Sequence, residues 1–233
     1  MDTDHSTPVR PPATLARLGR LQRRWLLILW AALLGFWGSQ LTEAPITKDA
    51  AENLAMAFSL KDQGVISSSP EPPYEKSMSR EPLPAVINAA NLYIIEALAG
   101  RVTYAESLTG ARARTLKLQN LFWLSLLSAA IFTATFRFSG GSFVWSVATV
   151  ITTSALLLLP EVGTYMLNSL CTEAPAAALL SLGSLFAAES IRRPRWPNLL
   201  GAGITFGLLS LVKASFFYVS LGLVVFTPLL LLL

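Results

Sequence analysis

The sequence has very little of the chemistry that soluble enzymes commonly use. Its 233 residues include one cysteine, Cys171, and one histidine, His5. A single cysteine excludes an internal disulfide and a cysteine-based zinc site. His5 lies in a Pro/Thr-rich tail, which argues against a histidine-containing triad or a histidine-rich metal centre. Charged residues make up only 14% of the chain, against about 25% in an ordinary soluble domain.

Apolar residues, by contrast, are abundant and lie in long blocks. The hydrophobic share is 53%, and the charges are confined to the gaps between the blocks. A soluble chain needs more polar residues to cover its surface, whereas a membrane-spanning helix needs roughly 20 apolar residues. The pattern predicts an all-α, polytopic transmembrane bundle. The net charge of +4 comes from basic residues at block ends, so it indicates membrane topology and not nucleic-acid binding.

The first 24 residues form a basic tail before the first apolar block. Residues 1–20 are polar and rich in proline, which predicts disorder. A basic start before a short apolar run also fits a signal peptide. Because the run 25–41 is rich in Trp and Leu and no small-x-small cleavage pattern follows, we interpret it as a retained anchor. The tail arginines predict a cytoplasmic N-terminus at the cell inner (plasma) membrane; they are Arg10, Arg17, Arg20, Arg23 and Arg24.

Six apolar blocks are candidate membrane spans. They are 25–41, 118–136, 142–160, 174–189, 199–212 and 216–233. The segments 42–114 and 161–173 are then expected on the outer side, with a tight turn near Lys213. Since a terminal carboxylate is costly in hydrocarbon, the end of the chain inside an apolar run predicts a C-terminally incomplete fragment. The expected membrane domain is 25–233.

The long outer loop contains two candidate juxtamembrane helices. Residues 49–63 place Ala51, Leu54, Ala55 and Phe58 on one face, as in an amphipathic helix. Gly64 suits the end of that helix. Residues 83–99 also show helical spacing of apolar residues, but they include side chains that are costly in lipid: Asn88, Asn91 and Glu96.

The placement of 83–99 decides the topology of all that follows. If it lies along the interface, Arg137 and the cluster at 192–195 face the cytoplasm. If it spans the bilayer, those arginines face outward, and the basic residues between 101 and 117 face inward. The positive-inside rule hardly separates the two cases. The polar residues within 83–99 favour the interfacial helix.

Ionisable residues beside membrane spans are candidate functional residues. Asp49 fits either an N-terminal helix cap or a general base at the membrane surface. Glu173, before Pro175, fits either a cap or a catalytic acid. Lys213 and Arg80 fit either snorkelling to the headgroups or binding of a phosphate group.

The order of these features resembles the polytopic glycosyltransferases of the GT-C superfamily. It is most similar to the bacterial aminoarabinose transferase of lipid A and the protein O-mannosyltransferase-like (PMT) enzymes. The similar elements are Asp49 with the helix ending at Gly64, Arg80-Glu81-Pro82-Leu83-Pro84 with the run to Gly100, Arg112-Ala113-Arg114, Leu159-Pro160, Thr172-Glu173 and Gly207-Leu208 through Lys213. The chain departs from that pattern at Asn53, where an aromatic is usual, and at Glu173, where the family has Asp.

The resemblance implies sugar transfer, with inversion, from a polyprenyl-phosphate-linked donor on the non-cytoplasmic face. The acceptor would be a lipid, a glycan or a protein. Asp49 would be the general base and Glu173 a second acid, while Arg80 and Lys213 would bind the donor phosphate. The one candidate cofactor is a divalent cation, which Asp49 and Glu173 would hold. The expected partners are this donor, the acceptor and membrane lipids, without nucleic acid.

Two other functions stay open at this stage. One is a multi-pass transporter or lipid flippase, although such proteins typically show internal repeats and none is found here. The other is a non-catalytic membrane assembly subunit. Small residues that let helices approach closely would serve such a subunit, or only ordinary packing within the membrane: Gly183, Ser184, Gly201, Gly203 and Gly207.

Overall fold

The computed structural model describes residues 19–71, 81–218 and 221–222. Over these residues the chain is helical and contains no strand, which confirms the predicted all-α class. The predicted disordered tail up to residue 18 and the segment 72–80, with Arg80, lie outside the described residues. So does most of the last apolar block, 216–233.

Ten α-helices and one short 3-10 helix follow each other in the described part of the chain. They are α1 Arg20–Ser39, α2 Asp49–Gln63, α3 Pro82–Ala99, α4 Tyr104–Ser107, α5 Gly110–Lys117, α6 Gln119–Phe138, α7 Phe143–Ala155, η1 Leu156–Leu158, α8 Pro160–Met166, α9 Glu173–Arg192 and α10 Trp196–Val212.

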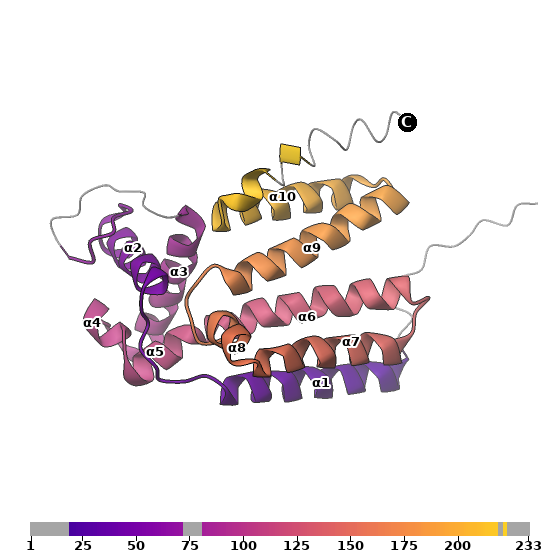
Figure 1. Cartoon of the computed structure of the whole chain (residues 1–233), viewed down its shortest axis with the longest axis horizontal. Helices are drawn as coiled ribbons and strands as arrows, with labels where there is room; N and C mark the ends of the chain where they lie inside the picture. Colours follow the sequence, from indigo (N-terminus) through magenta and orange to yellow (C-terminus); the bar gives the residue numbers. More distant parts are fainter. Residues whose placement is uncertain (1–18, 72–80, 219–220, 223–233) are drawn as a thin grey trace, which may run out of the picture.

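The long helices form a bundle, and α2 to α5 gather at one of its ends (Figure 1). Within the bundle α6 packs against α1, α7 and α9, and α9 packs against α10. We call the end with α2 to α5 the loop end. The opposite end, where α1 begins and where the α6–α7 and α9–α10 turns lie, we call the arginine end (Figure 1). Its arginines are Arg20, Arg23, Arg24, Arg137, Arg192, Arg193 and Arg195.

Side-chain contacts join the helices at the arginine end. The guanidinium of Arg137 on α6 pairs with Glu189 on α9 at 2.8 Å. The guanidinium carbon of Arg192 lies 5.4 Å from the centre of the Phe138 ring. Arg137 and Arg192 therefore join α6 to α9 at this end.

Three described helical segments are long and apolar enough to cross a membrane: Pro82–Ala99, Gly110–Phe138 and Glu173–Arg192. A fourth is added if Phe143–Leu158 and Pro160–Met166, bent by 99°, count as one span. The chain is thus a helical protein with about three or four candidate spans among these residues. α10 is apolar but shorter, and α1 is not among the three because arginines and tryptophans lower its hydropathy. The count of six spans stays a prediction.

The bend after α7 follows from Pro160. Proline disfavours a helical conformation at the residue before it, and Leu159 is extended, with φ of −67° and ψ of 125°. α8 then folds back so closely that a Cβ on Gly163 would lie 2.5 Å from the carbonyl oxygen of Leu157. Only glycine fits this approach, so the predicted span 142–160 ends in a sharp corner at the loop end.

The two loop helices begin and end close to where the sequence predicts. α2 ends at Gly64, which has φ of 68°, and α3 ends at Gly100, with φ of 81°. Both glycines have a positive φ, which glycine adopts without a steric cost, and Gly64 has the left-handed conformation typical of the residue that ends a helix. The predicted one-sided burial of α2 is too simple, however, because residues 53–59 are all buried.

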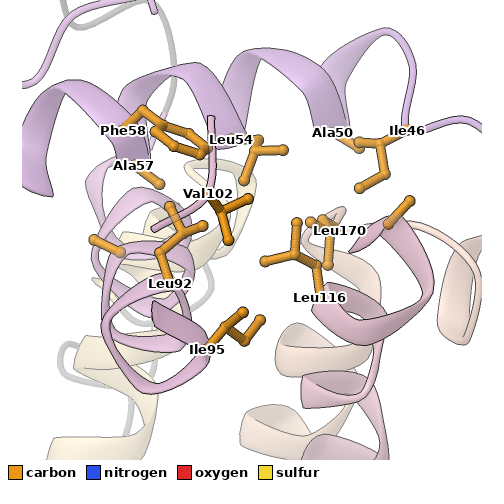
Figure 2. Packing of buried hydrophobic residues seen from close by; sticks show 12 residues of the cluster. Ile46, Ala50, Leu54, Ala57, Phe58, Leu92, Ile95, Val102, Leu116 and Leu170 are labelled. Atoms are coloured by element: carbon orange, nitrogen blue, oxygen red, sulfur yellow. The ribbon is translucent and has the colours of Figure 1, made fainter. Parts of the chain in front are cut away.

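α2 is buried on most sides because it packs between α3 and two loop segments. Its apolar residues form a cluster with α3, α5 and the loop before α9 (Figure 2). Ser67 in the following loop donates its N–H to the Ser59 hydroxyl at 3.0 Å. The ammonium of Lys61 meets both oxygens of Glu96 on α3, at 3.0 and 3.1 Å. The loop end is therefore a packed unit.

Two glycines let α9 and α10 pack closely, as predicted for helix packing in membranes. A Cβ on Gly183 would lie 3.0 Å from the Thr205 hydroxyl, and one on Gly201 would lie 3.0 Å from the Phe186 ring. Gly203 and Gly207 do not have this packing role, because a Cβ at either position would meet nothing within 4 Å.

Candidate functional site

Asp49 is the first residue of α2, and its side chain is exposed. The predicted capping role of Asp49 is wrong, because Lys48 occupies the N-cap position. The Lys48 carbonyl accepts the N–H groups of Ala51 and Glu52, and Lys48 itself has φ of 51°, which is rare for a residue with a side chain. An acid in the first turn still interacts favourably with the helix dipole.

Glu173 is the first residue of α9, with Thr172 at the N-cap position and Pro175 in the first turn. Its Oε1 lies 3.5 Å from the ammonium nitrogen of Lys213. Both side chains are partly exposed, 34% for Glu173 and 42% for Lys213, so water screens the pair and it adds little to stability. Two residues that the sequence marks as candidates, 40 positions apart, are thus in contact.

The second carboxylate oxygen of Glu173 is buried and makes no hydrogen bond within the described part of the chain. A carboxylate oxygen shielded from water without a donor costs free energy. The pair with Lys213 therefore leaves one oxygen of Glu173 without a donor among the described residues.

A third residue joins this site from α3. Glu81, next to Arg80 in the sequence, accepts the backbone N–H of Ala214 on its Oε1 at 3.0 Å. Ala214 follows Lys213, so Glu81 and Glu173 act on the same turn after α10. We call Glu81, Glu173, Lys213 and Ala214 the carboxylate–lysine cluster.

The start of α2 lies against the loop that leads into α9. The side-chain amide of Asn53 donates to the carbonyl of Leu170 at 3.4 Å. Figure 2 shows Ile46 and Ala50, on either side of Asp49 in the sequence, close to Leu170. Because Leu170 is three residues before Glu173, Asp49 and the carboxylate–lysine cluster lie at the same end of the bundle. Asp49 is not a member of the Glu173–Lys213 pair.

Two asparagines hold the loop before α9 in place. Asn168 accepts the Thr42 N–H at 2.7 Å and donates to the Gln40 carbonyl at 3.0 Å. Asn120, buried at the start of α6, donates to the carbonyls of Leu167 and Ser169 at 2.9 and 2.8 Å. These bonds tie the ends of α1 and α8 to α6, and the position of Glu173 follows from them.

Lys117 has a structural role that sequence reasoning missed. It is fully buried, and its ammonium donates to the carbonyls of Thr42 and Ala44 at 3.0 and 2.7 Å. The sequence suggests only a topology-determining charge, because a lysine beside an apolar block is usually at the surface. Its ligands are backbone carbonyls, and no side-chain pattern could have indicated them.

One ion pair links the helix with Asp49 to the helix that begins after Glu81. Lys61 pairs with Asp62 at 2.7 Å and with Glu96 at 3.0 Å. Burial by itself lowers the pKa of Lys61, but the hydrogen bonds to Asp62 and Glu96 outweigh it and raise that pKa above its ordinary value. The charged form of Lys61 therefore stabilises the contact between α2 and α3.

A divalent cation held by Asp49 and Glu173 stays a prediction. Within residues 19–71, 81–218 and 221–222, no three His, Cys, Asp or Glu side chains are grouped as a metal site would need. Comparison of the chain with family models, curated proteins and solved structures found no match. The function must therefore be argued from the site itself.

Proposed function

We propose that this chain is part of a membrane glycosyltransferase that uses a sugar linked to a polyprenyl phosphate. One observation carries the proposal: Asp49 and the Glu173–Lys213 pair lie at one end of the helical bundle, and seven of the ten described arginines lie at the other. Transfer from a lipid-linked donor uses a base for the acceptor hydroxyl and a cation for the leaving phosphate, both at one membrane surface. The GT-C-like order of sequence elements supports the same function.

The proposed topology has the arginine end in the cytoplasm and the loop end outside. The connections at the arginine end are short and rich in arginine, which the positive-inside rule places in the cytoplasm. Arg101, Arg112 and Arg114 belong to the long loop 42–114, and long loops cross the membrane with less regard to charge. The six spans are the blocks 25–41, 118–136, 142–160, 174–189, 199–212 and 216–233, and α3 lies along the interface. The position of α3 beside α2, at the end of the long helices (Figure 1), supports that assignment.

The donor keeps its polyprenyl tail in the lipid, so its phosphate reaches the protein at the bilayer surface. The phosphate is the leaving group and departs as a stable anion, which a fixed cation stabilises. Lys213 at the end of α10 is the proposed cation, with Arg80 as a second one. At rest, Glu173 takes the position of that anion beside Lys213.

The acceptor hydroxyl attacks the anomeric carbon from the face opposite the phosphate. A bond forms between the acceptor oxygen and the anomeric carbon, and the bond from that carbon to the phosphate oxygen breaks. Its electron pair leaves with the polyprenyl phosphate, and the acceptor proton passes to the Asp49 carboxylate as general base. A single displacement without an enzyme nucleophile inverts the anomeric centre, unlike the two-carboxylate retaining mechanism.

Glu173 is the proposed second acid, which orients the acceptor or a divalent cation. Its buried, unbonded oxygen supports this role, because a hydroxyl donor or a cation would satisfy that oxygen. Entry of the donor phosphate at Lys213 would release the other oxygen for the same purpose.

The test is release of polyprenyl phosphate from sugar-linked donors by the purified protein in lipid, with Asp49→Asn and Glu52→Gln compared. Glu52 is an exposed acid in the same first helical turn, so its replacement removes equal charge. We expect Asp49→Asn to reduce transfer at least about a hundredfold, the scale of general-base catalysis, and Glu52→Gln to stay near wild type. Equal rates in both variants would refute the base role. Movement of donor across the bilayer without release of polyprenyl phosphate would indicate a transporter.

A further inference from the structure

Glu81 makes a contact that its position in the chain does not explain. It is the N-cap residue of α3, where a carboxylate usually accepts N–H groups of the first turn. No side-chain capping bond is made there. The Glu81 carboxylate instead accepts the N–H of Ala214, 133 residues further along the chain, at 3.0 Å.

The sequence explains why Glu81 is available for this contact. α3 begins Pro82-Leu83-Pro84, so two of its first three residues have no N–H to offer. A capping side chain bonds the second or third N–H of a helix, and the third is missing here. The carboxylate therefore loses little by turning away from its own helix.

The contact fixes the backbone on the far side of Lys213. The Lys213 N–H donates to the carbonyl of Leu209 at 3.0 Å, which closes α10. The Lys213 carbonyl accepts the N–H of Phe216 at 2.9 Å, and the next N–H, that of Ala214, goes to Glu81. Lys213 is thus held in an extended conformation by groups on both sides. Among the described residues, its ammonium contacts the Glu173 carboxylate, at 3.5 Å.

We propose that Glu81 is a positioning residue for phosphate recognition, which holds Lys213 beside Glu173 through the backbone of Ala214. The inference rests on the proposed function, because it assigns a phosphate-binding role to Lys213. Glu81 itself does not touch the substrate. A fixed backbone leaves only the side-chain rotamers of Lys213 to be ordered when the phosphate binds, and this preorganisation favours affinity.

The test uses Glu81→Ala and Glu81→Gln in the whole protein in detergent. Glutamine keeps a carbonyl oxygen that can accept the Ala214 N–H but has no negative charge. It therefore separates the effect of the hydrogen bond from that of the Glu81 charge. Glu161→Ala removes an exposed acid at the start of another helix and is the matched control. The first readout is the dissociation constant of a sugar-free polyprenyl phosphate, measured by intrinsic tryptophan fluorescence. The second is the split between KM and kcat for a sugar-linked donor.

We expect Glu81→Ala to weaken binding of the polyprenyl phosphate about tenfold, the scale for loss of one hydrogen bond to a charged group. KM for the donor should rise by a similar factor while kcat stays nearly unchanged. This is the result expected when a variant weakens binding of the substrate and of the transition state equally. Glu81→Gln and Glu161→Ala should stay within about threefold of wild type. A loss of folded protein without a change in the dissociation constant of the folded fraction would overturn the proposal.

Two further outcomes separate the claims. Equal weakening in Glu81→Gln and Glu81→Ala would overturn the positioning role, because the amide oxygen would then not replace the carboxylate. The variants could also show the expected dependence of polyprenyl phosphate binding on Glu81 while the wild type releases no polyprenyl phosphate from any donor. That result would support the positioning role and refute glycosyl transfer.

Discussion

The contact between α2 and α3 depends on Lys61 and Glu96, and its strength can be measured by a double-mutant cycle. Lys61→Met keeps the apolar stem and removes the charge. Glu96→Gln keeps the oxygen that accepts the Val102 N–H at 3.2 Å and removes only the negative charge. The two substitutions therefore isolate the ion pair, because neither leaves a large cavity or an unbonded backbone group.

The expected magnitude follows from the exposure of the two side chains. Exposed pairs contribute about 0.2–1 kcal/mol, and removal of one partner of a fully buried pair costs about 3–5 kcal/mol. The Lys61 side chain is 5% exposed and that of Glu96 19%, so each single substitution should cost about 2 kcal/mol. The double variant should cost less than the sum, with a coupling energy of about 1–2 kcal/mol.

The assay is unfolding in detergent, followed by circular dichroism, with Asp62→Asn as the control. Asp62 also touches Lys61, at 2.7 Å, but its side chain is 30% exposed and it is the next residue in the chain. Its loss should cost less than about 1 kcal/mol. Additive effects of Lys61→Met and Glu96→Gln would refute the reasoning, because the pair would then not join α2 to α3.

Three further predictions follow from contacts in the described residues. The folded state raises the pKa of Lys61, so the wild type should be more stable than Lys61→Met. This difference in unfolding free energy should be constant below the ordinary lysine pKa of 10.5 and should fall as the pH rises through the higher pKa of the folded state. Unfolding midpoints of both proteins, measured against pH, test this. Gly163→Ala should destabilise the protein by about 2 kcal/mol or more through the 2.5 Å clash with a backbone oxygen, whereas Gly203→Ala, which meets nothing within 4 Å, should be neutral or stabilising in the same unfolding assay. Lys117→Met should lower the unfolding midpoint strongly, since two carbonyls lose a charged donor, and a wild-type midpoint would contradict this.

Helix positions could be predicted because they depend on local sequence. The start of α2 at Asp49 and its end at Gly64 follow from an apolar period and a residue suited to φ above zero. The corner at Pro160 and the fold-back at Gly163 also have local causes, but the sequence shows only a proline, not the direction that the chain takes after it.

The site could be predicted only in part. Glu173 and Lys213 are visible as charges beside apolar blocks, but their contact depends on the packing of α9 against α10. The roles of Glu81 and Lys117 depend on backbone partners far along the chain, and the side-chain pattern of the sequence does not mark such partners. Asp49 is a clear candidate in the sequence, but its assignment as the capping residue failed because the helix begins one position earlier than a cap at Asp49 requires.

Side-specific cysteine labelling tests the central claim most directly. With Cys171 replaced by alanine, Asp49→Cys, Thr172→Cys and Ser139→Cys are treated in intact cells with a membrane-impermeant maleimide. Ser139 is exposed in the α6–α7 turn at the arginine end. The proposed function predicts labelling at positions 49 and 172 from outside, and labelling at 139 only after the membrane is opened. Labelling of 49 and 172 from opposite sides of the membrane would contradict a shared site for glycosyl transfer.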